Sequence, residues 1–227
     1  MSWASPEARL VRGQVFSRFA AEGRPPSIAE LEELTGLDRG PVLAALAELH
    51  EAHALVLTRA GDAIRMAHPF SAWPMGFVAR SGDRFWWGGC AWDSLGIVAA
   101  LGERLTILTA CPHCGRELSY TAGPRNPPDA ADVLVRVPRP AAQWWDDVVA
   151  TCTAIRAFCS GEHLEAWIAR TGEAPGASVE LERLWELALP WYGDRLDPEW
   201  APQSRRHRQD LLERSGLGGP FWELPGE

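Results

Sequence analysis

Apolar residues recur every three or four positions through the N-terminal quarter of the chain, which is the spacing of one helix face. The pattern predicts a first helix over residues 7–21, and a Pro-Pro pair at 25–26 prevents its continuation. Ser27 is a good N-cap with a glutamate three residues later, so we expect a second helix over residues 28–35. A third helix is predicted over residues 38–53.

Two short stretches rich in apolar and β-branched residues follow these helices. Residues 55–58 and 63–66 are predicted strands, joined by a Gly-Asp turn at 61–62. Three helices followed by a hairpin resemble a winged helix. We therefore expect residues 1–70 to form a winged-helix-like N-terminal domain.

The charge of this region bears on whether it binds DNA. Residues 1–68 hold seven arginines and nine acidic residues. The predicted third helix, which would enter the groove, has Asp38, Glu48 and Glu51 against a single basic residue, Arg39. Phosphate contacts from basic residues supply most of the affinity for DNA. The sequence therefore disfavours nucleic-acid binding and favours a domain that serves packing.

The rest of the chain mixes predicted strands and helices after a linker at residues 68–74. The predicted strands are 76–80, 84–87, 106–109, 118–121, 133–137 and 148–155. The predicted helices are 91–101, 160–170 and 179–189, and the tail beyond them is expected to be irregular. The fold class expected is α+β, in which the winged-helix-like domain precedes a mixed domain over residues 71–227 with a small β-sheet.

Composition narrows the function classes. Apolar residues make up 46% of the 227 residues, which is typical of a globular protein. A net charge of −8 disfavours an anionic membrane or nucleic acid held by charge. No segment resembles a signal peptide or a membrane helix, so we expect a cytoplasmic protein. All 22 basic residues are arginines, which excludes a Schiff-base or P-loop lysine. Five cysteines, an odd number, disfavour a disulfide framework and favour metal binding or catalysis.

Two cysteines lie in segments that suit chemistry. Cys90 follows two glycines at the start of a predicted helix, where backbone amides stabilise a thiolate, and Asp93 lies on the same face three residues later. Cys152 has polar neighbours on a predicted strand and could face a cleft. Taken one at a time, each segment also fits a buried structural cysteine, with Asp93 as a helix-start residue.

The ordered set of motifs resembles the organomercurial (alkylmercury) lyase family over most of the chain. The matching features are C-A-W-D-S-L at 90–95, C-x-x-I-x-x-F-x-S from Cys152, Trp167, H-P-F-S-A at 68–72 and G-L-G-G-P-F-W at 216–222. The chain departs from the best-known lyases at 154–157, which lacks their His- and Phe-rich stretch. Three tryptophans also crowd the first cysteine: Trp86, Trp87 and Trp92. These departures make the identity of the substrate less certain than the fold.

The resemblance implies a carbon–mercury lyase in which Cys90 and Cys152 bind mercury as thiolates and Asp93 carries the proton. Mercury is a very soft cation, and thiolates are soft protein ligands. A general acid within hydrogen-bond reach can protonate the carbon and break its bond to mercury. The implied partners are a small organometal substrate, whose mercury is also the product metal, and external thiols that remove it. The resemblance implies no organic cofactor.

The remaining cysteines form a separate pattern that suggests a structural zinc ion. Cys111 and Cys114 lie in a C-P-H-C-G turn, whereas Cys159 and His163 are four residues apart where a helix is predicted to begin. A knuckle turn plus the first turn of a helix is how a treble-clef zinc site is built. The sequence therefore predicts a treble-clef-like core, provided that the two halves meet.

Three alternatives remain open at this point. The chain could be a non-catalytic thiol protein that binds soft metals, a metal-sensing transcriptional regulator, or a relative repurposed to another substrate. A lyase needs Asp93 next to both cysteines, and a regulator needs a basic reader helix. The chain also has twelve tryptophans. Those at 144–145 and 191–200 could line an apolar pocket, but we expect them to serve packing and assign no site to them.

Overall fold

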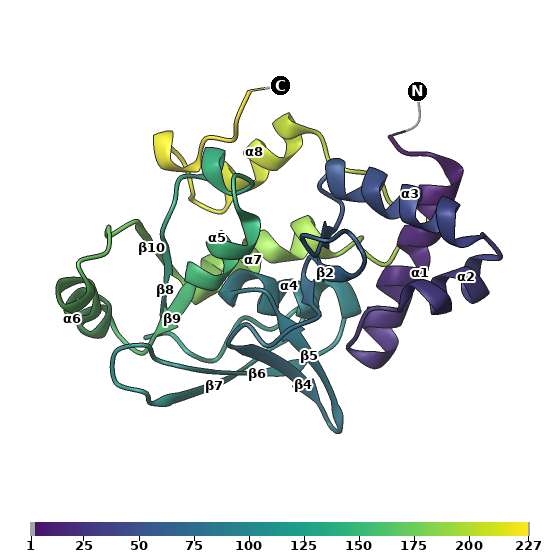
Figure 1. Ribbon diagram of the computed structural model, residues 1–227. Helices are drawn as coiled ribbons and strands as arrows, with labels where there is room; N and C mark the ends of the chain where they lie inside the picture. The colour runs from purple at the N-terminus through teal and green to yellow at the C-terminus, as the bar shows by residue number, and fades with distance from the viewer. Residues whose placement is uncertain (1–2, 227) are drawn as a thin grey trace.

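The computed structural model describes residues 3–226, and Figure 1 shows how their helices and strands are arranged. The α-helices are α1 (Pro6–Glu22), α2 (Ile28–Thr35), α3 (Arg39–Glu51), α4 (Ala91–Leu101), α5 (Val148–Ala154), α6 (Gly161–Thr171), α7 (Leu181–Tyr192) and α8 (Arg205–Arg214). The strands are β1 (Val56–Leu57), β2 (Ile64–Ala67), β3 (Phe70–Ser71), β4 (Phe77–Ser81), β5 (Arg84–Gly88), β6 (Leu105–Ala110), β7 (Glu117–Ala122), β8 (Leu134–Val137), β9 (Arg156–Phe158) and β10 (Ala177–Glu180). Two short 3-10 helices lie at Ala141–Gln143 and Pro220–Trp222. The protein is α+β, as predicted.

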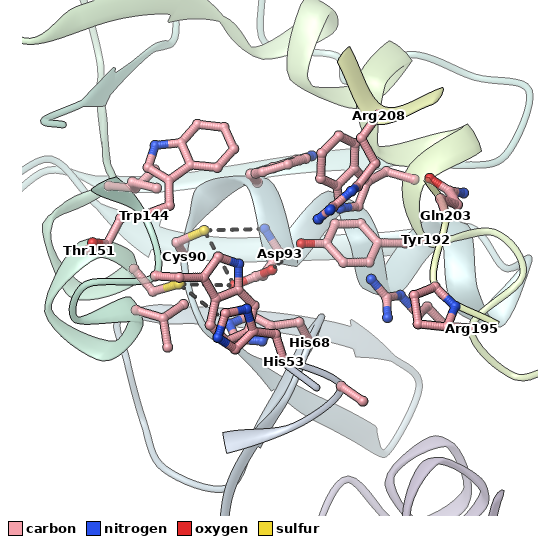
Figure 2. Close-up of a pocket in the computed structure, with 18 of the residues that line it drawn as sticks. His53, His68, Cys90, Asp93, Trp144, Thr151, Tyr192, Arg195, Gln203 and Arg208 are labelled. Atoms are coloured by element: carbon pink, nitrogen blue, oxygen red, sulfur yellow. Dashed lines mark hydrogen bonds between the residues drawn. The ribbon is translucent and has the colours of Figure 1, made fainter. Parts of the chain in front are cut away.

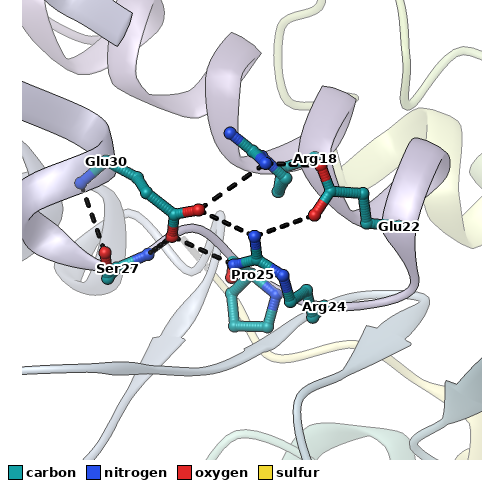
Figure 3. Close-up of polar contacts among 6 residues, drawn as sticks. All are labelled: Arg18, Glu22, Arg24, Pro25, Ser27 and Glu30. Atoms are coloured by element: carbon teal, nitrogen blue, oxygen red, sulfur yellow. Dashed lines mark hydrogen bonds and ion pairs between the residues drawn. The ribbon is translucent and has the colours of Figure 1, made fainter. Parts of the chain in front are cut away.

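The N-terminal elements follow the predicted order of three helices and a hairpin, with α1, α2 and α3 grouped at one end of the molecule (Figure 1). The predicted capping box of α2 is present, because Glu30 N donates to Ser27 Oγ and Ser27 N donates to Glu30 Oε2. The carboxylate of Glu30 also pairs with Arg24, which reaches Glu22, and with Arg18 (Figure 3). These arginines are therefore engaged with acidic residues of their own domain.

A seven-stranded antiparallel sheet runs through the predicted domain boundary at residue 70. Its strand order is β1-β2-β3-β5-β4-β6-β7. The expected linker at 68–74 contains β3, which pairs with β2 on one side and β5 on the other. The sheet is consequently larger than predicted, because the N-terminal hairpin joins it. A second sheet of three strands has the order β10-β8-β9.

Helix α4 lies at the centre of the molecule, between the large sheet and α7 (Figure 1). Its sequence is apolar almost all the way round, and every residue from Ala91 to Ala100 is buried, as expected for a helix enclosed on all sides. A row of buried side chains from neighbouring strands, Ala79, Ile107 and Tyr120, crosses the sheet. Because α4 is enclosed on all sides, its buried polar residues, Asp93 and Ser94, need hydrogen-bond partners inside the protein.

Helix α5 replaces a predicted strand, so the expectation for residues 148–155 was wrong. The β-branched residues of this segment favour a strand, but Asp147 caps a helix by accepting a hydrogen bond from Ala150 N at 2.9 Å. The strand β9 begins only at Arg156. Cys152 consequently lies on a helix rather than on a strand.

Two other expectations near the C-terminus need correction. The helix predicted from residue 179 begins at Leu181, because Val179 belongs to β10 and pairs with Val135. The tail is not irregular throughout, since α8 forms behind a Ser204 cap. Its sequence is strongly polar, and its helical pattern rests mainly on Leu211 and Leu212, the residues that it buries. Among the described residues, no helix is both long and apolar enough to cross a membrane.

The junction between α1 and β5 provides a test of the packing. Gly23 and Gly36 both end helices with φ near +70°, so alanine at either position strains the backbone by about 1–2 kcal/mol. A Cβ on Gly23 would also lie 2.3 Å from the Phe85 carbonyl oxygen, whereas a Cβ on Gly36 would meet nothing within 4 Å. We expect Gly23→Ala to lower the free energy of unfolding by at least about 1 kcal/mol more than Gly36→Ala. Urea denaturation of both variants measures the difference, and equal losses would contradict the observed contact.

Candidate active site

The start of α4 brings a thiol and a carboxylate together. Gly89 precedes Cys90, and a Cβ on this glycine would lie 2.4 Å from both Asp93 Oδ2 and Met66 Cε, so a larger residue does not fit there. Cys90 occupies the N-cap position, and its sulfur accepts a hydrogen bond from Asp93 N at 3.4 Å. The Cys90 thiol in turn lies 3.4 Å from Asp93 Oδ2, to which it donates.

The second thiol reaches the same carboxylate oxygen from α5. Cys152 Sγ lies 3.7 Å from Asp93 Oδ2, although Cys152 is 62 positions beyond Cys90 in the sequence. Figure 2 shows the Cys90 and Asp93 side chains joined by dashed contacts. All three side chains are buried, with exposed fractions of 1% for Cys90, 1% for Asp93 and 6% for Cys152. The structure therefore brings together the three residues to which the sequence assigned chemistry.

Tyr192, at the end of α7, holds the other oxygen of the carboxylate. Its hydroxyl donates to Asp93 Oδ1 at 2.8 Å. Its ring packs directly on Gly96 of α4, where a Cβ would lie 2.5 Å from the Tyr192 ring. The sequence analysis did not select Tyr192. The available signal was a tyrosine on an apolar helix face, because a buried tyrosine hydroxyl usually has a hydrogen-bond partner.

His68 lies beside the second thiol and was also missed, since its motif was assigned to a linker. Its Nε2 is 3.6 Å from Cys152 Sγ. Burial lowers the pKa of His68, so the imidazole is neutral at pH 7 and can accept the thiol proton through an unprotonated nitrogen. His68, Asp93 and Cys152 each offer a potential metal-ligand atom within 4.8 Å of the others.

A cavity of about 170 Å³ opens onto these groups. Its aromatic walls come from tryptophans that were expected to serve packing or to crowd the first cysteine: Trp92, Trp144, Trp145, Trp191 and Trp200. Trp86 is not among them, because it is buried against α1 and donates to Phe19 O at 2.9 Å. The N-terminal helical region also reaches the cavity through His53, whose ring stacks on Trp145 at 4.1 Å.

The other end of the cavity is lined by two arginines, Arg195 and Arg208 (Figure 2). The Nε atom of each is buried without a hydrogen-bond partner among the described residues. Arg195 lies over the rings of Tyr192 and Trp200, with its guanidinium carbon 5.3 Å and 4.7 Å from their centroids. The cavity thus combines aromatic walls, a carboxylate between two thiols and a cationic end.

The four residues predicted to bind zinc also converge, at a separate place. Cys111, Cys114, Cys159 and His163 each offer one ligand atom, and these atoms all lie within 4.8 Å of one another. None of the four lines the cavity. The two halves of the predicted site therefore meet in the fold.

Comparison with known proteins identifies the family. The family model for alkylmercury lyase matches residues 70–193, more than half of the chain and including Cys90, Asp93, Cys152 and Tyr192. The chain belongs to the alkylmercury lyase family. One similar solved structure is the crystal structure of the mercury-bound form of MerB2, with 23% sequence identity and a TM-score of 0.61. The match covers 85% of this chain and 91% of that chain. No curated protein matches the chain.

Family membership makes this chain an alkylmercury-lyase-like enzyme, as the resemblance implied. The similar structure has the same overall fold, and at this level of identity the likeness concerns the fold alone. His68 and Arg195 lie just outside the matched segment, so the walls of the cavity extend beyond the part of the chain that the family model describes.

Electrostatics keep both thiols of this lyase protonated. Burial raises the pKa of Cys90 from its ordinary value of 9.0, and the charge of Asp93 raises it further. Interaction with Cys90, followed by burial, raises the pKa of Cys152 well above 9.0. The helix N-terminus was expected to stabilise a Cys90 thiolate, but burial and the adjacent carboxylate dominate. Each thiol therefore has a proton to release when a soft metal binds.

These pKa shifts predict how stability responds to alkaline pH. Both thiols have pKa values above 9.0 in the folded state, so their contribution is fully present below pH 9 and is lost as pH rises toward the folded values. We expect the urea midpoint to fall as the pH rises above about 9. The Cys90→Ser/Cys152→Ser variant should fall less steeply, because serine does not titrate there. If the urea midpoints of the two proteins fell equally with pH, the loss of stability could not be attributed to Cys90 and Cys152.

Proposed function

We propose that the protein cleaves carbon–mercury bonds by protonolysis, with Cys90 and Cys152 binding mercury and Asp93 carrying the proton. The observation that carries the proposal is the position of Asp93 Oδ2, which lies 3.4 Å from one sulfur and 3.7 Å from the other. A carboxylate in this position can take a proton from a thiol when mercury binds the sulfur. It can then deliver that proton to a carbon on the same metal.

The overall reaction balances with the two thiol protons alone. An organomercurial R–Hg–X reacts with both cysteine thiols to give R–H, HX and mercury bound by two thiolates. One thiol proton leaves with X, and Asp93 transfers the other to carbon while the electron pair of the carbon–mercury bond moves to that carbon. Two thiolates on the metal donate electron density that favours this protonation.

The surroundings of Asp93 suit a group that alternates between base and acid. Tyr192 holds Oδ1, which leaves Oδ2 directed toward both sulfurs. Neutral His68 offers a second acceptor next to Cys152. External thiols are expected to exchange with the cysteines and remove the mercuric ion, since thiolates compete best for a soft metal.

The cavity indicates which organic groups fit on mercury. Tryptophan rings form its walls, which favours apolar and aromatic groups over small polar ones. Arg195 and Arg208 lie at the far end of the cavity. Among the described residues, neither guanidinium forms an ion pair, so this end of the cavity is positively charged. We therefore infer that arylmercury compounds, including those with an anionic substituent, suit this cavity.

The alternatives account for less of what is observed. A non-catalytic mercury binder needs two thiols but no buried carboxylate between them. A metal-sensing regulator needs a basic reader helix, whereas α3 is acidic overall. We infer that the winged-helix-like domain serves packing and closes one wall of the cavity through His53. A cytoplasmic location also fits the reduced thiols that the mechanism requires.

The direct test is to incubate the purified protein with phenylmercury or methylmercury and excess thiol, then to measure benzene or methane. The proposal expects stoichiometric hydrocarbon release with multiple turnovers. Tight mercury binding without hydrocarbon would instead identify the non-catalytic alternative. Turnover of neither substrate, without mercury binding, would favour a repurposed relative.

Asp93→Asn should separate binding from turnover. The amide is nearly isosteric but cannot carry the acid proton, so we expect mercury binding to persist and turnover to fall by at least about a hundredfold. Single-turnover benzene release and mercury-binding titration measure the two effects. As matched controls, Cys90→Ser and Cys152→Ser should weaken mercury binding itself, because a hydroxyl is a hard ligand. If Asp93→Asn turned over at the wild-type rate, Asp93 would have only a structural role at the start of the helix.

Tyr192→Phe tests whether the hydroxyl positions the carboxylate. Removal of this buried donor leaves Asp93 Oδ1 unpaired, which costs about 1–3 kcal/mol. We expect kcat for phenylmercury to fall by about 10- to 100-fold with little change in KM, since the ring remains in the wall. Tyr120→Phe is the control, because it removes the other tyrosine hydroxyl, which is buried without a hydrogen-bond partner among the described residues. Equal effects of the two changes on kcat would indicate a packing role only.

A further inference from the structure

A second cluster of sulfur and imidazole groups lies outside the cavity and is not used by the proposed reaction. Cys111 and Cys114 come from the turn between β6 and β7. Cys159 follows β9 directly, and His163 lies in the first turn of α6, which Ser160 caps through His163 N. Two segments that are distant in sequence thus place four metal-binding side chains at one point.

The spacing of the ligand atoms fits a tetrahedral zinc ion. Zinc–sulfur bonds of about 2.3 Å and zinc–nitrogen bonds of about 2.0 Å place neighbouring ligand atoms about 3.5–3.8 Å apart. Cys114 Sγ and Cys159 Sγ are 3.8 Å apart, and so are Cys111 Sγ and His163 Nδ1. Cys159 Sγ and His163 Nδ1 are closer, at 2.9 Å, and a small displacement of either side chain gives the tetrahedral edge.

We propose that Cys111, Cys114, Cys159 and His163 hold a structural zinc ion. Four protein ligands complete a tetrahedral shell and leave no open position for substrate, which is the mark of a structural rather than a catalytic site. A hairpin that carries a knuckle, together with the first turn of a helix, is also the treble-clef arrangement predicted from the sequence. The site goes beyond the lyase reaction and does not depend on it.

The turn that carries the first two ligands is built as a metal knuckle. Gly115 adopts φ +74° and donates from its N–H to Cys111 O at 2.9 Å, which curls the chain around the cluster. Backbone amides of Cys159, Cys114 and His113 are directed at the Cys111 sulfur. Amides directed at a sulfur stabilise a thiolate, the form that binds zinc.

The outer contacts also hold the two halves together. Arg170, near the end of α6, donates to Pro112 O and His113 O at 3.3 Å and 3.4 Å. The ring of His113 lies 4.8 Å from that of His163. Such contacts outside the ligand set orient the ligands of a metal site.

The zinc ion would stabilise the segment that carries the second reactive thiol. Cys152 lies on α5, and only the short strand β9 separates α5 from Cys159. The metal would therefore fix the far end of this segment to the β6–β7 hairpin. Loss of the ion should lower thermal stability, and this readout is separate from lyase activity.

The first experiment measures metal in protein purified without added zinc. Elemental analysis should give about one zinc per chain, and replacement by cobalt(II) should produce the absorption of a tetrahedral thiolate site. The Cys90→Ser/Cys152→Ser variant should retain the full zinc content, because its changes lie in the cavity. A failure of the lyase reaction would leave this result unchanged, so the two proposals fail separately.

The second experiment uses the exposed ligand, Cys114, with a matched pair of variants. Cys114→Ser should lose most of its zinc and lower the Tm by about 5 °C or more. Cys114→His keeps a zinc-competent ligand at the same exposed position and should retain both zinc and most of the stability. If Cys114→Ser does not fold, the contrast with a folded Cys114→His still supports the site.

Three results would overturn the proposal. The first is a zinc content near zero in the wild-type protein together with no cobalt spectrum after reconstitution. The second is unchanged zinc content in a folded Cys114→Ser variant. A disulfide between Cys114 and Cys159, detected by mass spectrometry in protein purified under reducing conditions, would also exclude the zinc ligand set.

Discussion

The burial of Asp93 is the constraint on which the rest of the site depends. An unpaired carboxylate inside a protein is costly, so the fold must supply donors for both of its oxygens. The Tyr192 hydroxyl donates a hydrogen bond to Oδ1, and the thiols of Cys90 and Cys152 donate to Oδ2. Because the carboxylate lies between two thiols, the contacts that make its burial tolerable are also the ones that the proposed proton transfer would use.

Several features of the fold serve that one contact. Gly89 leaves room for the carboxylate, and Gly96 leaves room for the Tyr192 ring, whose hydroxyl reaches that carboxylate. The central position of α4 removes the thiols from water, which raises the pKa of Cys90 and keeps its proton available. Reaction chemistry and packing are therefore not separable here, since the helix that carries the first thiol is also the centre of the core.

The two sulfur clusters illustrate different uses of the same residue types. At the cavity, two thiols, a carboxylate and a neutral imidazole surround open space that a substrate can enter. At the β6–β7 turn, three thiols and an imidazole converge at a place outside this cavity. An open set with a proton carrier suits turnover, whereas a closed tetrahedral set suits a resident ion. The short β9 lies between α5 and Cys159, so the proposed zinc ion would stabilise the segment that carries Cys152.

The sequence by itself determined the features that rest on local chemistry. Helix caps such as the Ser27 box, the paired strands on either side of residues 81–83, and the Cys90–Asp93 spacing within one turn are all fixed by neighbours in the chain. The ordered motifs also indicated the family, which the match over residues 70–193 confirms. Such features need no long-range contact to be recognised.

Only the tertiary structure decided the remainder. The segment of Cys152 has strand-like residues, but a local cap and packing make it a helix, and its distance to Asp93 depends on how α5 meets α4. Tyr192 and His68 come from segments with no spacing relation to Cys90, so no periodicity could identify them. The sheet crosses the predicted domain boundary because β3 pairs on both sides. Contacts between distant segments depend on the packing of the whole chain, which a local pattern does not encode.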